Sequence, residues 1–300
     1  MTGVAPSGVA RGVARTALLV AAARAIETHR VDALASDPYA EHFVRAEPAC
    51  ADWPLRPWQV PDGEADPLWG RLGRYFGLRT RVVDDFLLAA ARSGIRQLVL
   101  LGAGLDTRAY RLVWPDGLAV FEIDRRPVLT FKERVLADLP PSAPAAEPRA
   151  ARHALAADLT GSWATALTDA GFDPARPTAW LAEGLLLYLP AATERRLIDT
   201  VDRLSAPGSA LLYEIKLVES ARVRSGAVYT HTLGRTGVDL LALFAGGPRP
   251  DSAGDLAARG WVPTVHTPFT FTSRHGRGPR PEPNDALAGN RWVFAHRPRR

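Results

Sequence analysis

Two closely spaced glycines are the first feature of this 300-residue chain that could bind a ligand. Gly102 and Gly104 follow the apolar run 97–101, which is typical of a strand buried on both faces of a parallel sheet. Glycines at the carboxyl end of such a strand let the backbone approach a cofactor closely. About 20 residues later, the run 119–123 leads into Asp124, and a carboxylate at this spacing can accept both hydroxyls of an adenosine ribose. The pattern predicts a site for an adenosine-containing cofactor.

The glycine spacing also separates two classes of cofactor. A dinucleotide site needs a third glycine for the pyrophosphate and for close helix packing, and Thr107 stands at that position. S-adenosylmethionine carries no phosphate, so it needs the glycine turn and the ribose carboxylate but not the third glycine. The sequence therefore favours S-adenosylmethionine over NAD(P), although Arg125 and Arg126 could hold a 2′-phosphate. Glu122, on the same strand face as Asp124, is expected to be structural and to pair with an arginine or a backbone group.

Alternating strand and helix patterns are expected to position these residues. Such alternation predicts an α/β, Rossmann-like doubly wound sheet. The last two strand-like runs flank a loop expected at 273–285 and should form a hairpin-like pair. The strand-like runs are 97–101, 119–123, 178–181, 210–215, 261–266 and 291–296, and helical patterns between them include 126–138 and 193–204.

The chain is expected to be a single structural unit with three parts. Residues 1–92 should form an N-terminal helical cap, because helical patterns occur at 16–27 and 72–92 and no strand-like run interrupts them. Residues 93–300 should form the core. Within the core, residues 216–247 carry a helical pattern near the edge where such sheets bind ligands, which predicts a helical lid. Three tryptophans, Trp53, Trp58 and Trp69, are expected to pack inside the cap.

Composition excludes several classes of protein. The chain is 47% hydrophobic and 23% charged, which fits a globular domain rather than a disordered one. Its net charge of +5 comes from arginines spread along the chain, so we expect no nucleic-acid partner. Cys50 is the only cysteine, which rules out an internal disulfide and a thiolate cluster, and we expect no metal site. No apolar run reaches the ~20 residues that span a bilayer, so we expect a cytoplasmic protein without a membrane partner.

Seven segments between about residue 15 and residue 215 occur in an order and spacing typical of one enzyme family. They are TALLVAAARAIE (16–27), DPYA (37–40), RTRVVDDF (79–86), LGAGLDTRAYRL (101–112), FEID (121–124), ADL (157–159) and AEGLLLYLP (182–190). Together they resemble the S-adenosylmethionine-dependent O-methyltransferases related to leucine carboxyl methyltransferase. The resemblance extends to the bacterial branch with polyketide carboxyl methyltransferases of the tetracenomycin type. It implies a seven-stranded, mostly parallel sheet and a role in secondary metabolite biosynthesis.

This resemblance also implies roles for residues in the matching motifs. Gly102 and Gly104 would line the methionine part of the cofactor. Asp124 would hold the ribose, and Asp158 with Leu159 would contact the adenine.

An arginine in the helix before the first strand would bind the cofactor carboxylate. Arg79 is the preferred match and Arg81 the second, while Arg24 on the opening helix is a further candidate. Glu183 would lie beside the methionine or the acceptor. The predicted cofactor-binding set is Arg24, Arg79, Arg81, Gly102, Ala103, Gly104, Asp106, Asp124, Asp158, Leu159 and Glu183.

No motif identifies the acceptor site. The lid offers Arg222, Tyr229 and His231, which fit a polar lid as well as an acceptor pocket, with Arg222 a candidate for an anionic acceptor. Glu183, Tyr188 and His231 are the candidates for a catalytic role. A carboxylate, with a pKa of roughly 4, is already ionised, whereas a phenol near pKa ~10 would normally need a general base. Because no His–carboxylate pair stands out, we predict in-line methyl transfer to a small-molecule carboxylate, with a phenol as the alternative.

The sequence leaves two further functions open. An NAD(P)-dependent oxidoreductase could use the same sheet, and a binding protein could retain the fold without catalysis. A hydrolase is disfavoured because the chain has no Gly-x-Ser-x-Gly motif, and zinc chemistry because it has no His-Glu-x-x-His motif. The sequence leaves the oligomeric state open.

Overall fold

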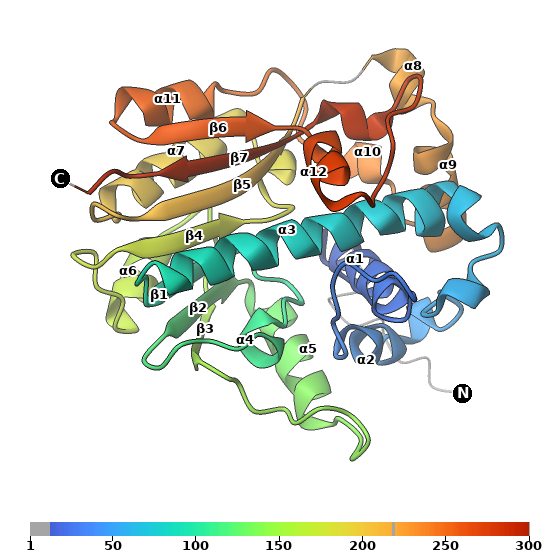
Figure 1. Cartoon of the computed structure of the whole chain (residues 1–300), viewed down its shortest axis with the longest axis horizontal. Helices are drawn as coiled ribbons and strands as arrows, with labels where there is room; N and C mark the ends of the chain where they lie inside the picture. The colour runs from blue at the N-terminus through green and yellow to red at the C-terminus, as the bar shows by residue number, and fades with distance from the viewer. Residues whose placement is uncertain (1–12, 218–219, 300) are drawn as a thin grey trace.

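Seven strands form one mixed sheet at the centre of the molecule (Figure 1). The structure is a computed structural model that describes residues 13–217 and 220–299. The strand order is β3-β2-β1-β4-β5-β7-β6, with β7 antiparallel between β5 and β6 and all other neighbours parallel. This confirms the doubly wound α/β prediction and the late hairpin-like pair. The strands are β1 Gln97–Leu101, β2 Ala119–Asp124, β3 Ala151–Ala156, β4 Thr178–Ala182, β5 Ala210–Lys216, β6 Val262–His266 and β7 Asn290–His296.

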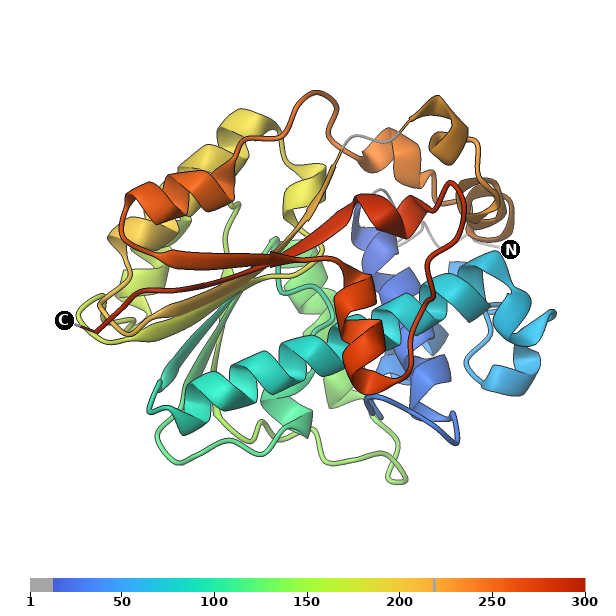
Figure 2. The same ribbon diagram turned by 45° about the horizontal axis from the view of Figure 1, so that its top comes forward.

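Helices cover both faces of the sheet, and Figure 2 shows it between the two layers. Alternate side chains of β1 point to opposite faces of the sheet. Leu98 and Leu100 pack in the hydrophobic core with α1, α3 and α5. Val99 and Leu101 pack in the core on the other face, with α6, α7 and α11. The core helices are α4 Arg108–Arg111, α5 Arg126–Ala137, α6 Trp163–Asp169, α7 Ala191–Arg203, α11 Ser252–Ala258 and α12 Pro268–His275.

From residue 13 to residue 92 the chain is helical apart from its connecting loops, and it packs on the sheet through its longest helix. Helix α3 crosses the face of the sheet beside α1 (Figure 1), and its buried side chains belong to the same hydrophobic core as those of β1 and β2. A π-helical segment, η5, leads directly into α3. The elements are α1 Val13–Thr28, α2 Ala40–Arg45, the 3₁₀ turns η2 Pro48–Cys50, η3 Pro57–Gln59 and η4 Gly63–Ala65, then η5 Pro67–Leu72 and α3 Gly73–Arg92.

The predicted lid is helical in the residues described. It lies over the carboxyl ends of the strands, at the right in Figure 1. Its helices are α8 Ala221–Arg224, α9 Ala227–Thr236 and α10 Leu240–Leu243. Two 3₁₀ turns, η6 Leu186–Tyr188 and η7 Ala286–Gly289, complete this end of the molecule.

Three local features differ from the sequence-based expectations. Strand β3 was not among the expected runs, because it lies at the edge of the sheet and carries Arg152 and His153 instead of an apolar run. Helix α12 extends into the start of the loop expected at 273–285. Trp53 and Trp69 pack together inside the cap with ring centroids 5.6 Å apart, but Trp58 is 75% exposed, so its expected burial was wrong.

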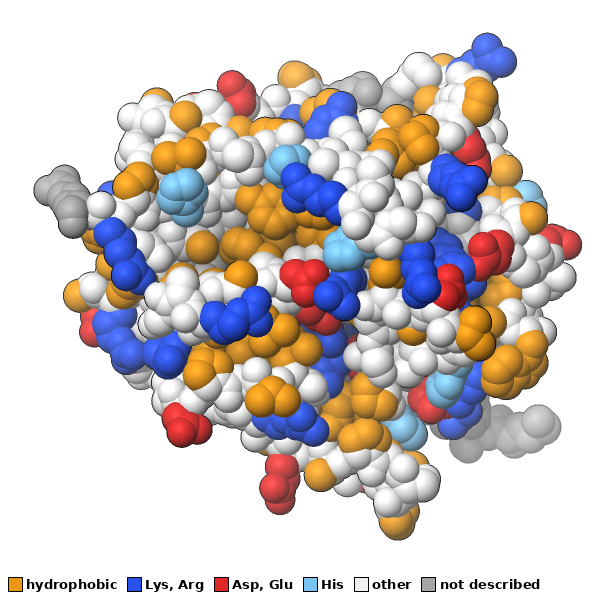
Figure 3. Space-filling model, viewed as in Figure 1, with side chains coloured by type: hydrophobic (Ala, Val, Ile, Leu, Met, Phe, Trp, Pro, Cys, Tyr) orange, Lys and Arg blue, Asp and Glu red, His pale blue; other side chains and the backbone are white. Residues whose placement is uncertain are grey.

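The described helices include none with both the length and the apolar character needed to cross a bilayer. On the face shown in Figure 3, Lys and Arg side chains are scattered among acidic and apolar ones.

Candidate functional site

A cavity of about 430 Å³ opens at the carboxyl ends of the central parallel strands. The residues that follow β1, β2, β3 and β4 line one end, and α1 and α3 contribute a wall. Lid helices α9 and α10 and the η7 turn line the other end. Open α/β sheets bind ligands at this edge, next to the point where the strand order reverses. Here that point lies between β1 and β4.

The glycine turn after β1 forms the floor of the cavity. The backbone N–H groups of Gly102 and Ala103 both donate to the Ile123 carbonyl on β2, at 2.9 and 3.1 Å. Gly102 has a φ of +66° and Gly104 a φ of +52°, which L side chains rarely adopt. A Cβ added to Gly102 would also lie 3.0 Å from a methyl carbon of Leu185. Both glycines are therefore required for this turn.

Asp124 ends β2 and faces the same cavity. Its carboxylate accepts hydrogen bonds from the backbone N–H of Gly104 at 2.6 Å and from that of Arg125 at 2.7 Å. Burial raises the pKa of Asp124 more than these two donors lower it. Each carboxylate oxygen keeps a further lone pair, so the group can still accept the two hydroxyls of a ribose. Its neighbour Glu122 is structural, as predicted: it is fully buried and pairs with Lys132 and Arg152.

Asp158 and Leu159 follow β3 and also line the cavity. The Asp158 carboxylate accepts from the backbone N–H and the hydroxyl of Thr160, both at 2.8 Å. These two bonds lower the pKa of Asp158. The tertiary structure thus brings both residues to the cavity wall near Asp124.

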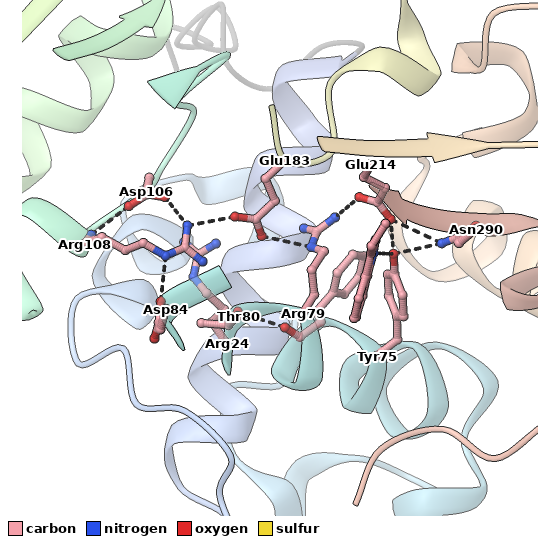
Figure 4. A network of polar contacts seen from close by, with 12 residues as sticks. Arg24, Tyr75, Arg79, Thr80, Asp84, Asp106, Arg108, Glu183, Glu214 and Asn290 are labelled. Atoms are coloured by element: carbon pink, nitrogen blue, oxygen red, sulfur yellow. Dashed lines mark hydrogen bonds and ion pairs between the residues drawn. The ribbon is translucent and has the colours of Figure 1, made fainter. Parts of the chain in front are cut away.

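Ion pairs link the glycine turn to the lid end of the cavity (Figure 4). Glu183, one residue after β4, accepts from Arg108 at 2.7 Å and pairs with Arg79 at 2.9 Å. Arg79, from α3, also donates to Glu214 of β5 at 2.8 Å, and Arg108 also binds Asp106. Burial alone would raise the pKa of Glu183, but the positive charges of Arg108 and Arg79 lower it overall. Positive and negative side chains thus alternate along this network, in which Asp106, Glu183, Arg79 and Glu214 line the cavity.

Sequence reasoning missed several members of this network and a glycine beside it. Arg108 lies in the GAGLDTR motif, which was the available signal, yet no role was assigned to it. Gly184 has a φ of +59°, and a Cβ there would lie 3.2 Å from a guanidinium nitrogen of Arg79, so this glycine makes room for the arginine. Glu214 and Tyr75 lie at the end of the network farthest from the glycine turn, where the Tyr75 hydroxyl donates to the Glu214 carboxylate. Nothing in the local sequence pattern marks either of them.

The three candidate arginines occupy different environments. Arg79 and Arg24 both line the cavity. Arg24 is fixed by the Asp37 carboxylate at 2.7 Å and by the Leu105 carbonyl at 2.7 Å. Arg81 does not reach the cavity: its side chain is 46% exposed and pairs with Asp85. Residues two positions apart lie on roughly opposite sides of a helix. Arg79 and Arg81 therefore could not both face the site, and the expectation for Arg81 was wrong.

The lid end of the cavity is lined mainly by aromatic and aliphatic side chains. The ring of Phe244 lies 5.9 Å from that of Tyr188 and 6.3 Å from that of Tyr229. Burial raises the pKa of Tyr188 to about 12. Lys216, at the end of β5, also lines this end and donates to the Ala286 carbonyl at 2.7 Å.

Two lid candidates lie away from this cavity. His231 is not among its described lining residues, and its Nδ1 lies 2.7 Å from the Ala227 carbonyl one turn earlier in α9. The structure therefore gives His231 no place beside the reacting atoms. Arg222 lines a second, neighbouring cavity.

Comparison with known proteins identifies a family. The family model described as leucine carboxyl methyltransferase matches residues 17–202. An S-adenosyl-L-methionine-dependent methyltransferase of Streptomyces coelicolor is 62% identical over 99% of this chain and 97% of its own length. One named likewise from Saccharopolyspora erythraea is 47% identical over 84% of each chain.

Solved structures support the fold alone. A methyltransferase structure from Thermobifida fusca has a TM-score of 0.50 at 17% identity, covering 86% of this chain and 94% of its own. A DUF574 family protein from Streptomyces avermitilis has a TM-score of 0.51 at 17% identity, covering 92% of this chain and all of its own.

Proposed function

The chain belongs to the leucine carboxyl methyltransferase family and is an S-adenosyl-L-methionine-dependent methyltransferase, and we propose that it methylates a carboxylate of a small organic molecule. The family relationship supports the methyl transfer, while the acceptor is inferred from the chemistry of the cavity. A polyketide or another secondary metabolite is the class of acceptor that we propose, following the sequence resemblance.

The donor set around the glycine turn fits S-adenosylmethionine. Asp124 offers free lone pairs to the ribose hydroxyls, and Gly102 and Gly104 leave room for the methionine portion beside the backbone. Arg79 and Arg24, which both line the cavity, would hold its carboxylate. When bound, the cofactor supplies a methyl group on a sulfonium sulfur for in-line transfer.

The observation that supports a carboxylate acceptor is that the described residues lining the cavity include no histidine and no unpaired glutamate as a general base, because Glu214, like Glu183, is paired with Arg79. None of the chain's seven histidines is among these residues. The Glu183 carboxylate is held by two arginines that lower its pKa, so it is a weak base. Burial raises the pKa of Tyr188 to about 12, so the phenol stays protonated at neutral pH. A carboxylate acceptor needs no base, because it is ionised above a pH of roughly 4.

The residues at the lid end then act by positioning and by excluding water. Tyr188, Tyr229 and Phe244 would cover the reacting group and keep water out. Lys216 would bring a positive charge to the carboxylate and orient one of its oxygens. Proton transfer is not required of any residue in this scheme.

Matched pairs of acceptors test the proposal. The enzyme is incubated with S-adenosylmethionine and either an aromatic acid or the corresponding phenol, for example naphthoic acid and naphthol. We expect a product one methylene heavier from the acid, which mild alkali cleaves because it is a methyl ester. We also expect a rate that is nearly independent of pH between roughly pH 6 and 9, since no group of the mechanism titrates there.

Tyr188→Phe serves as the matched variant and should keep most of the wild-type kcat. An alkali-stable methyl ether, or a rate that rises about tenfold per pH unit, would instead identify a phenol acceptor.

A further inference from the structure

A second cavity of about 390 Å³ adjoins the lid end of the first, and the methyl transfer proposed above does not use it. Three segments that are far apart in the sequence enclose it. They are η5 before α3, residues 222–228 of the lid, and residues 282–287 before β7. We call it the outer cavity and the cofactor-binding cavity the inner one.

The two cavities meet at an apolar boundary. The residues that line both of them are Leu72, Val228, Ala286 and Leu287. The inner cavity, at about 430 Å³, is near the lower end of the range of about 300–1,000 Å³ for small-molecule sites. It has to hold the cofactor as well as the reacting end of the acceptor. A polyketide-sized acceptor would therefore extend past this boundary into the outer cavity.

The outer cavity differs from the inner one in its charges. Arg71 is neutralised there by Asp285 at 2.5 Å and Glu282 at 2.9 Å, which also ties the loop before β7 to η5. Arg222, on α8, has an exposed side chain at the same cavity. Within residues 13–217 and 220–299, no carboxylate forms an ion pair with Arg222. Among the described residues that line the outer cavity, Arg222 is thus the cation whose charge is available to a ligand.

We propose that the acceptor is an elongated molecule with an anionic group at each end. One carboxylate lies in the inner cavity and receives the methyl group, the apolar middle crosses the boundary at Val228, and the second anionic group binds Arg222. Arg222 is then a specificity-determining residue that selects long acceptors with a charged distal end. The inference rests on the proposed function, since it takes the inner group to be a carboxylate.

Calorimetry with two series of acids tests this assignment. The full-length protein, saturated with S-adenosylhomocysteine, is titrated with α,ω-dicarboxylic acids from octanedioate to hexadecanedioate and with monocarboxylic acids of the same lengths. We expect one range of lengths at which the dicarboxylate binds about fivefold more tightly than its monocarboxylate partner, the scale of a partly exposed ion pair.

Arg222→Ala should abolish this difference, and Arg222→Glu should reverse it. Arg224→Ala is the matched control, because Arg224 is an exposed arginine on the same short helix and does not line the outer cavity. This control should behave like the wild type.

The outcomes separate the two proposals. Equal binding of the two series, or the same effect from Arg222→Ala and Arg224→Ala, would overturn the assignment of Arg222 and leave the outer cavity a solvent-filled entrance. If short acids are still esterified in the matched-acceptor assay, only this inference fails. If no acid binds and no ester forms, the carboxylate proposal fails, and this inference with it.

Discussion

The two ends of the inner cavity are built in different ways. At the cofactor end, polar groups are fixed by backbone hydrogen bonds and ion pairs, as in the bonds of Asp124 to Gly104 and of Glu183 to Arg108. At the lid end, where we propose that the acceptor binds, the ring of Tyr229 on helix α9 lies 6.3 Å from that of Phe244, which directly follows α10. The end around the glycine turn therefore depends on individual polar groups, whereas the lid end depends on the shape that its apolar side chains form together.

This difference explains why the sequence predicts the residues at one end of the cavity better than those at the other. A cofactor with a ribose and an amino acid moiety needs particular donors and acceptors at particular places, and short motifs can supply them. An apolar pocket needs only volume and shape, which many different residues can provide. The following predictions test how strongly each end depends on individual side chains, beginning with the largest effect.

Removing Arg108 should have the largest effect on stability. Its side chain is only 4% exposed and binds Asp84, Asp106 and Glu183. Arg108→Met would leave these carboxylates buried without one of their cations, which should lower the free energy of unfolding by about 3–5 kcal/mol. Chemical denaturation measures this change. Arg81→Met is the control, because the exposed Arg81 pair should contribute at most about 1 kcal/mol. Similar losses in both variants would show that the buried network is not the stabilising element.

Removing the carboxylate of Asp124 should mainly weaken cofactor binding. Asp124→Ala loses the equivalent of one charge-assisted hydrogen bond to the ribose, about 1.5–3 kcal/mol, so the affinity for S-adenosylmethionine should fall about 10- to 150-fold. Titration calorimetry measures the affinity, and thermal denaturation checks that the variant is folded. Unchanged affinity in a folded variant would place the ribose elsewhere. Tight binding of NADH by the wild type in the same experiment would contradict the choice of cofactor.

Releasing the lid should have a smaller effect on stability than removing Arg108, about 1–3 kcal/mol, because one oxygen of a buried carboxylate loses its partner. Arg235, on α9, pairs with the buried carboxylate of Asp66 at the start of η5 and so ties the lid to the cap. The Asp66 carboxylate keeps its two backbone donors, the N–H groups of Leu68 and Trp69, in Arg235→Ala. We expect faster hydrogen exchange in α9 and a higher KM for the acceptor, with unchanged affinity for S-adenosylmethionine. A change in cofactor affinity of the same size as that in KM would mean that the two ends are coupled.

Local patterns predicted most of the sheet because its buried strands are short apolar runs. The edge strand β3 is only partly buried along its length and carries polar residues, so no apolar run marks it. The same limit applies to single side chains. The spacing of the GAGLDTR and FEID motifs located the cofactor end, yet it did not reveal that Arg108 and Glu183 meet across 75 residues.

The sequence by itself determined the fold class, the family and the cofactor, because these depend on contiguous motifs and on the alternation of strands and helices. Only the tertiary structure decided which arginines face the inner cavity, that His231 is not among its described lining residues, and that Arg222 lines an outer cavity next to the lid end. The physical reason is that the direction of a helix face and the meeting of distant segments depend on packing. The positions of the arginines in the sequence did not show which of them are functional. The fold distinguishes buried, paired arginines such as Arg108 from exposed ones such as Arg81.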